Sequence, residues 1–398
     1  MLLKAPGERW ILVAGLGVTT IVSYGVTQYL FGVLVVPIQH DLGWSRAQIS
    51  GAFSLGLIVW GVLGVPVGRL VDHSGARWPM TAGSLLAAFS LLGLARIHEL
   101  WQLYLLWSGG LGTAMALTLY PVTFTVVANW FQQRRGAALA LLTVIGGLSS
   151  PLYVPLAGWL VAHLGWRDAL EVLAATVLLI ALPLHALLVR QAPAGAGPAT
   201  GSALGEALRR PPFWLLTASN ALSALAYAVL LVHTVPFLIG RGYNPVLAAG
   251  VFGLIGVASL PGRFLFNLLS DRVGPQGLLA LCTALQGAAV AILLTGNPVL
   301  FVLVYGATFG AISPLRASTM ADHFGRMAYG SITAVQNLPS GILSGLGPFL
   351  AGYLYDRLGG YNLAFELTAG AFLASSVLIY LTPRSDQQER QPESLQDQ

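Results

Sequence analysis

The sequence predicts an all-α membrane protein with twelve transmembrane helices arranged as two pseudo-symmetric six-helix bundles, and three observations lead to this fold class. Of the 398 residues, 56% are hydrophobic and only 9% are charged, whereas soluble domains carry roughly 25% charged residues. Long apolar runs recur along the whole chain, and the second half repeats residue patterns of the first. Most of the surface must therefore face lipid. At about 20 residues a span, twelve spans leave no room for a sizeable soluble domain.

Twelve apolar runs follow one another, separated by Gly, Pro or charged residues. The first, from 10 to 36, is longer than the roughly 7 to 15 residues of a signal-peptide core, so it is predicted to be a retained helix. The first half continues with runs near 46–67, 79–97, 101–127, 137–162 and 168–190. The second half has runs near 213–239, 246–269, 277–296, 298–320, 330–355 and 362–382.

These runs divide the chain into four parts. We expect an N-terminal bundle over 1–190, a cytoplasmic linker over 191–212, a C-terminal bundle over 213–383 and a disordered polar tail over 384–398.

The loops carry their Lys and Arg residues unevenly, which predicts the orientation in the membrane. If the amino terminus is cytoplasmic, that side holds Lys4, Arg9, Arg69, Arg77, Arg134, Arg135, Arg190, Arg209, Arg210, Arg272, Arg316, Arg326, Arg384 and Arg390. The opposite side holds Arg46, Arg96, Arg167, Arg241 and Arg357. Both termini are therefore expected in the cytoplasm, with the bilayer of the plasma membrane as surroundings. The net charge of +5 comes from single basic residues that form no stripe for a phosphate backbone, which argues against nucleic acid as a partner.

The two halves share short residue patterns. The segment Leu156 to Leu160 (LAGWL) recurs as Leu350 to Leu354 (LAGYL), and Asp72-x-x-Gly75 is echoed by Asp271-x-x-Gly274. Internal repeats of this kind are typical of secondary transporters built from two related bundles. The sequence thus predicts a transporter and not an enzyme.

The segment Gly68 to Arg77 (GRLVDHSGAR) resembles the loop signature of the major facilitator superfamily, a Gly-x-x-x-Asp-x-x-Gly-x-Arg pattern. The resemblance implies that Asp72, with Arg69 and Arg77 beside it and Asp271 in the second copy, acts as a latch between conformers. An Asp at a helix end accepts hydrogen bonds from backbone N–H groups or Arg in one conformer and loses them in the other. Plain solvation of the loop is the alternative.

Further segments resemble the monocarboxylate transporter branch of this superfamily, which includes bacterial oxalate/formate antiporters. They are Gly43 to Arg46, Asn129 to Gly136, Gly165 to Arg167 and Ala321 to Arg326. The resemblance extends over nearly the whole chain and implies a carrier of small organic anions.

Arg263 is predicted to lie well inside the eighth helix, and no other basic residue is placed so deeply. An Arg toward the bilayer centre costs at least about 2.5 kcal/mol on insertion scales, so it is expected to face the protein interior or a watery cavity. Its guanidinium matches a carboxylate through two parallel hydrogen bonds, and the resemblance implies the same role of substrate anchor. Pairing with backbone carbonyls and an interfacial, snorkelling Arg are the alternatives.

The resemblance also implies which residues line the substrate cavity. On helix 1 it points to Gln28 and Tyr29, on helices 4 and 5 to Tyr120 and Tyr153, and Asn337 is a central polar residue of helix 11. Gln28 stands where animal proton-coupled members have a titrating Lys, and an amide cannot carry the proton. With Arg263 as the single fixed cation, we expect a monoanion.

Several other polar residues have structural interpretations. His233 titrates in a range suited to a proton site, but a hydrogen-bonded structural role is the stronger alternative. Tyr227 and Tyr305 could complete the pocket, with packing as the stronger alternative, and helix polarity is the stronger explanation of Glu171 and Glu366. The sequence shows no metal cluster, nucleotide cradle or catalytic triad, so neither a metal nor a cofactor is expected.

The resulting hypothesis is a secondary active transporter, functional as a monomer, for a small monocarboxylate such as lactate, pyruvate or formate. Proton symport, anion exchange of the oxalate/formate type and uniport stay open, as does another small organic solute. A membrane sensor that binds a carboxylate without moving it is the alternative from a different class.

Overall fold

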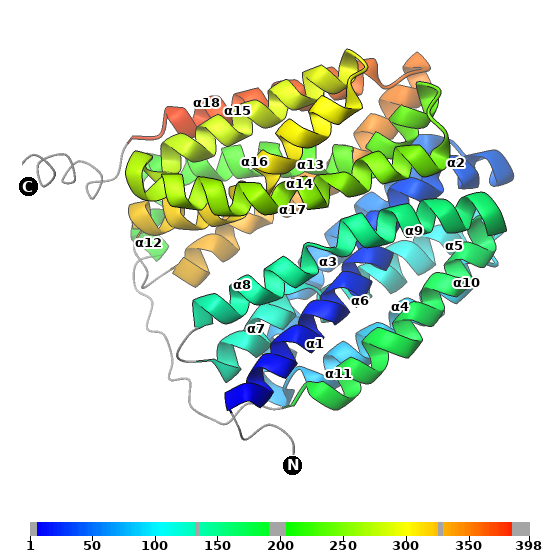
Figure 1. Ribbon diagram of the computed structural model, residues 1–398, viewed down its shortest axis with the longest axis horizontal. Coiled ribbons are helices and arrows are strands. Elements are labelled where there is room, and N and C mark those ends of the chain that lie inside the picture. Colours follow the sequence, from blue (N-terminus) through cyan, green and yellow to red (C-terminus); the bar gives the residue numbers. More distant parts are fainter. Residues whose placement is uncertain (1–5, 132–134, 191–203, 325–328, 384–398) are drawn as a thin grey trace, which may run out of the picture. The chain divides into compact units, whose positions relative to one another are not determined.

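The computed structural model describes residues 6–131, 135–190, 204–324 and 329–383. Over these ranges the chain forms helices joined by short connections, and they contain no strand (Figure 1).

The first half contains six successive helical segments, several of them interrupted. The first is continuous through α1 (Pro6–Tyr24), the π-helix η1 (Gly25–Tyr29) and α2 (Leu30–Leu42). The next two are α3 (Arg46–Ser74) and α4 (Arg77–Leu94). The fourth comprises α5 (Leu100–Leu103), the π-helix η2 (Tyr104–Leu111), α6 (Gly112–Thr118) and α7 (Tyr120–Trp130). The last two consist of α8 (Arg135–Gly146) with α9 (Ser149–Leu164), and α10 (Trp166–Thr176), η3 (Val177–Ala181) and α11 (Leu182–Leu188).

After the short helix α12 (Leu204–Ala207), six longer helices follow in the second half. They are α13 (Pro211–Gly240), α14 (Pro245–Val273), α15 (Pro275–Leu294), α16 (Pro298–Phe324), α17 (Tyr329–Leu358) and α18 (Asn362–Tyr380).

The helices fall where the apolar runs predict them. Ten stretches within the described residues are long and apolar enough to cross a membrane. The remaining predicted spans, the third and the eleventh, correspond to α4 and α17. The chain is thus an all-α membrane protein whose helices follow the twelve predicted runs in order.

Both ends of α3 are set by backbone hydrogen bonding and backbone conformation. At the start of α3, the Ser45 hydroxyl accepts a hydrogen bond from the Gln48 N–H while the Gln48 side chain accepts one from the Ser45 N–H, a reciprocal cap. At its other end α3 continues past the predicted limit at residue 67 to Ser74, and it stops at Gly75, whose φ of 76° suits glycine. The segment Gly68 to Ser74, expected in a loop, is therefore helical.

The chain divides into two compact units. The first consists of Met1–Ala196, Leu231–Val257 and Pro348–Gly360, and the second of Gly197–Leu230, Ala258–Gly347 and Tyr361–Gln398. Both units combine segments from distant parts of the sequence.

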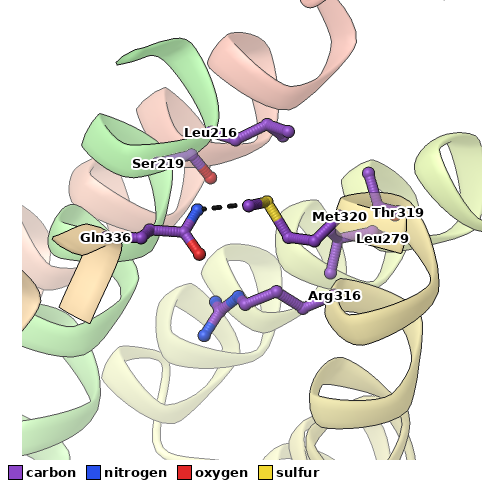
Figure 2. A pocket seen from close by; sticks show the side chains of 7 residues that line it. All are labelled: Leu216, Ser219, Leu279, Arg316, Thr319, Met320 and Gln336. Carbon is purple, nitrogen blue, oxygen red and sulfur yellow. Dashed lines mark hydrogen bonds between the residues drawn. The ribbon is translucent and has the colours of Figure 1, made fainter. Parts of the chain in front are cut away.

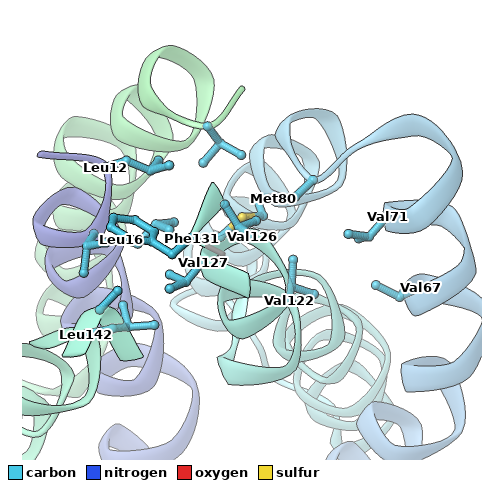
Figure 3. Close-up of a cluster of buried hydrophobic side chains, with 14 of the residues drawn as sticks. Leu12, Leu16, Val67, Val71, Met80, Val122, Val126, Val127, Phe131 and Leu142 are labelled. Atoms are coloured by element: carbon cyan, nitrogen blue, oxygen red, sulfur yellow. The ribbon is translucent and has the colours of Figure 1, made fainter. Parts of the chain in front are cut away.

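A buried apolar cluster holds together several helices of the first unit (Figure 3). It joins Leu12 and Leu16 of α1 to Val71 of α3, Met80 of α4 and Phe131 after α7. Since lipid tails are as apolar as these side chains, close packing and not exclusion from water accounts for their association within the bilayer.

In the second unit, helices approach so closely that only glycine fits between them. A Cβ on Gly262 of α14 would fall on the backbone carbonyl of Ala307 in α16, and a Cβ on Gly347 of α17 would lie 2.7 Å from the carbonyl oxygen of Leu225 in α13. Small residues at such crossings allow helix backbones to pack in lipid.

Candidate functional site

The π-helix η1 interrupts the first span at the residues expected to line the substrate cavity. It covers Gly25–Tyr29, and Gln28 within it is only 5% exposed. The Gln28 amide nitrogen lies 3.5 Å from the sulfur of Met115, which is a weak acceptor. Single π-turns inside α-helices are frequent at functional sites. Gln28 therefore lies at a local irregularity inside the first unit.

Three tyrosines gather beside this π-helix. The ring centroid of Tyr24 lies 4.8 Å from that of Tyr120 and 6.4 Å from that of Tyr29. Tyr120 begins α7 directly after Leu119, whose extended ψ of −175° separates α6 from α7. The structure thus connects the predicted Tyr29 and Tyr120 through Tyr24, which belongs to the same stretch of helix 1 as Gln28 and Tyr29.

Tyr153 of α9 packs against the π-helix from another side. A Cβ on Gly25 would clash with three atoms of the Tyr153 ring, so glycine at this position allows the contact. The Tyr153 hydroxyl donates a hydrogen bond to Oγ1 of Thr176 at 2.9 Å. Tyr153 therefore contributes an aromatic face next to η1, while its hydroxyl proton is engaged within the protein.

The predicted anchor Arg263 lies inside α14, between Ser259, which is 1% exposed, and the end of the helix at Val273. Its side chain falls outside the described residues, as do those of the predicted latch residues Asp72 and Asp271. The anchor and latch roles accordingly stay predictions. Arg69 and Arg77, the other predicted latch residues, are exposed.

Polar residues of α17 point in different directions. Asn337, the predicted cavity residue, is exposed, whereas its neighbour Gln336 is 2% exposed and Ser340 is 7% exposed. Asn220 of α13 donates a hydrogen bond to the Ser340 hydroxyl at 2.7 Å. The hydrogen bond between Asn220 and Ser340 joins α13 to α17 inside the second unit.

A second arginine lies within a helix of the second unit and was missed as a site residue. Arg316 lines a small cavity with Gln336 of α17, and Figure 2 shows the Gln336 amide and the Arg316 guanidinium extending into the same region from two helices. The other lining residues are Leu216, Ser219, Leu279, Thr319 and Met320. The Gln336 amide nitrogen lies 3.4 Å from the Met320 sulfur. Hydroxyl, amide and guanidinium groups thus border a space of about the size of one water molecule.

The assignment of Arg316 to a cytoplasmic loop is wrong. Helix α16 continues to Phe324, which places Arg316 about 12 Å before the helix end at 1.5 Å per residue. The predicted apolar run over 298–320 already contained Arg316. Hydropathy therefore indicated its helical position better than its inclusion among the loop arginines did. The expectation of a single basic residue well inside a helix is incorrect too.

His233 of α13 is fully buried in the first unit. Its Nε2 lies 2.9 Å from the Pro348 carbonyl oxygen and 3.4 Å from the Ser50 hydroxyl. A neutral ring with its proton on Nε2 donates to the carbonyl. The contacts favour the structural alternative for His233 over the proton site.

The remaining polar candidates lie in ordinary packing or surface contacts. Glu171 pairs with Arg96 at 2.9 Å, and both side chains are exposed. Tyr227 and Tyr305 stack on Phe309, with ring centroids 5.3 Å and 5.9 Å away. Within the described residues, no group of three or more His, Cys, Asp or Glu side chains is placed to hold a metal ion.

Comparison with known proteins gives consistent matches along the chain. A sequence profile of the Major Facilitator Superfamily matches residues 16–345. Monocarboxylate transporter 13 of Bos taurus is 33% identical over 390 residues, which cover 94% of this chain and 89% of that protein. Monocarboxylate transporter 11 of Homo sapiens is 28% identical over 401 residues, covering 95% and 84%.

Solved transporter structures share the fold. A nucleoside transporter superposes with a TM-score of 0.77 at 13% identity, covering 94% of this chain and 99% of the other. A bacterial homologue of the human lysosomal transporter Spinster gives a TM-score of 0.74 at 17% identity, covering 97% and 99%.

Proposed function

Because the chain belongs to the major facilitator superfamily, we propose that it moves a small monocarboxylate across the membrane by alternating access. It is a membrane transporter related to the monocarboxylate transporters. The observation that carries the proposal is the similarity to monocarboxylate transporter 13, which extends over 94% of the chain. Lactate, pyruvate and formate are the acids that we would test first.

The chemistry of the two units supports an organic anion as substrate. Arg263 in α14 carries a permanent charge inside a membrane helix, where an ionisable residue is a functional hypothesis by default. We propose that its guanidinium binds the substrate carboxylate through two parallel hydrogen bonds. In the first unit, Gln28 and the aromatic rings of Tyr29, Tyr120 and Tyr153 would line the substrate path.

The proposal also includes how the carrier lies and what drives it. We propose a monomer in the plasma membrane with both termini in the cytoplasm, in line with the excess of Lys and Arg in the loops expected on that side. The amide of Gln28 cannot carry a proton, and His233 is held by Ser50 and Pro348. Proton symport therefore needs another titrating group, and anion exchange and uniport compete with it.

Uptake into proteoliposomes tests this function. We expect saturable uptake of at least one labelled monocarboxylate, with empty liposomes as the control. Driving uptake with an inward proton gradient, and separately with preloaded anion, distinguishes symport from exchange. Binding of the acid without any counterflow would indicate a sensor, and no saturable uptake of any of the three acids would contradict the proposal.

The position of Arg316 inside α16 favours a second candidate, an exchanger for two-carboxylate anions of the oxalate/formate type. With Arg263 it gives the second unit two basic residues inside helices, and two cations can neutralise two carboxylates. Ser219, Thr319 and Gln336 supply further polar groups around Arg316.

Competition by oxalate separates the two candidates. If Arg316 binds a second carboxylate, oxalate should inhibit monocarboxylate uptake, and Arg316→Gln should weaken this inhibition at least about tenfold, since hydrogen bonds to charged groups contribute about 1.5 to 3 kcal/mol. Arg96→Gln, which changes an exposed arginine, should leave inhibition unchanged. Weak inhibition in the unmodified protein would instead favour the monocarboxylate carrier.

A further inference from the structure

The carboxylate of Asp356, near the end of α17, binds the beginning of α3. Asp356 accepts hydrogen bonds from two backbone N–H groups in the first turn of α3, from Arg46 at 3.0 Å and from Ala47 at 2.8 Å, across 310 and 309 sequence positions. First-turn N–H groups have no partner inside their own helix, and the helix dipole favours a negative charge there. Ser45 caps the Gln48 N–H of the same turn at 3.2 Å. Asp356 thus completes from a distant helix a cap that the local sequence only begins.

Two further contacts bring the helices together at the same level. The Arg46 guanidinium lies 3.7 Å from the centre of the Tyr355 ring, a distance typical of a cation–π contact. A Cβ on Gly352 would lie 2.8 Å from the Arg46 carbonyl oxygen, so glycine permits this close approach of the two backbones.

The contact continues deeper along one face of α3. Arg46, Ser50 and Ser54 are spaced by four residues and so lie on one face of the helix. Ser54 accepts a hydrogen bond from the Phe349 N–H at 3.1 Å. Ser50 meets His233, which also contacts the Pro348 carbonyl. All of these residues belong to the first unit.

The contact between α3 and α17 is exposed to solvent at the start of α3 and buried further along the helix. Asp356 is exposed, whereas Ser50 and His233 have no exposed surface. When the helices separate, water can replace both hydrogen bonds of an exposed carboxylate, so releasing it leaves no buried charge without a partner. Such a contact can break and form again without leaving a charge buried and unpaired.

We propose that Asp356 is a reversible latch that closes the transporter at the end where α3 begins, and that the tip of α17 leaves α3 when that end opens. Ser50 and His233 then form the seal beneath the latch. The inference rests on alternating access as proposed above. By the loop charges, this end of the protein is expected to face away from the cytoplasm.

The rate at which a thiol reagent modifies a cysteine at position 50 tests the latch, and the measurement needs no transported substrate. The chain has one cysteine, Cys282, so a Ser50→Cys, Cys282→Ser protein reports on the seal alone. In lipid nanodiscs, a polar thiol reagent should modify Cys introduced at this fully buried position slowly. Adding Asp356→Asn should raise the rate at least about tenfold, because two hydrogen bonds to a charged group are weakened. Asp356→Glu, which keeps the charge, should raise it less.

Two controls separate gate opening from general unfolding. Glu366→Gln, a change of an exposed acid on α18, should leave the rate unchanged. In a protein that keeps Ser50 and the buried Cys282, Asp356→Asn should not accelerate modification of Cys282. Equal rates with and without Asp356→Asn, or an equal acceleration at Cys282, would overturn the latch. Because no transported acid enters the measurement, its failure leaves the monocarboxylate proposal standing.

Discussion

Replacing Arg263 by Ala is expected to abolish saturable uptake of lactate, pyruvate and formate into proteoliposomes. We propose that the guanidinium–carboxylate pair is shielded from bulk water, and removing one partner of such a pair typically costs about 2 to 5 kcal/mol. The apparent affinity should therefore fall at least about thirtyfold, and uptake should approach that of empty liposomes. Uptake of the labelled acids across a range of concentrations measures the effect.

Two further variants make this result interpretable. Arg263→Lys keeps a positive charge but loses the planar pair of parallel hydrogen bonds, so it should transport more than the Ala variant and less than the unmodified protein. Arg96→Ala removes an exposed arginine and should transport normally. Thermal unfolding of all three proteins checks that they fold. Full transport by a folded Arg263→Ala protein would remove Arg263 from the substrate path.

A single methyl group on Gly262 should strongly destabilise the second unit. In Gly262→Ala the new Cβ would fall on the backbone carbonyl of Ala307, and a backbone atom cannot rotate away as a side chain can. Helices α14 and α16 would have to move apart, and overpacking of this kind costs about 1 to 3 kcal/mol and occasionally more. We expect a loss at the upper end of this range, seen as a drop of several degrees in thermal unfolding in detergent.

Gly250→Ala is the matched control on the same helix. A Cβ at Gly250 would meet nothing within 4 Å, and Ala is about 0.8 to 1 kcal/mol more favourable than Gly inside a helix. This variant should be as stable as the unmodified protein or slightly more so. If the two variants unfold at the same temperature, the close approach at Gly262 is contradicted.

The helix positions were predictable because a span is long and uniform in composition. The run near 362–382, for example, corresponds to α18 (Asn362–Tyr380). Hydropathy did not predict the interruptions inside spans, although η1 includes the polar residues Thr27 and Gln28 and Pro121 follows the break at Leu119. Hydropathy indicates whether a segment lies in lipid or in water. It does not indicate where the backbone hydrogen bonds change from the α-helical to the π-helical pattern.

Side-chain groupings needed the fold. Resemblance to a family suggested Tyr29 and Tyr120, but the contacts of both rings with Tyr24 became evident only once α1 and α7 were placed. Asp356 is an unremarkable acid near a helix end until its helix meets the first turn of α3. Contacts across hundreds of positions depend on packing that a single sequence does not show.

The π-helix η1 changes the direction in which the side chains of the first span point. A π-turn accommodates one residue more than an α-turn, and each residue of an α-helix advances by about 100°. Side chains of α2 therefore point about 100° away from where an uninterrupted α1 would have directed them. The packing face of α1, which includes Leu12 and Leu16, therefore does not determine which way the side chains of α2 point. Gln28 and Tyr29 lie in the segment where this direction changes.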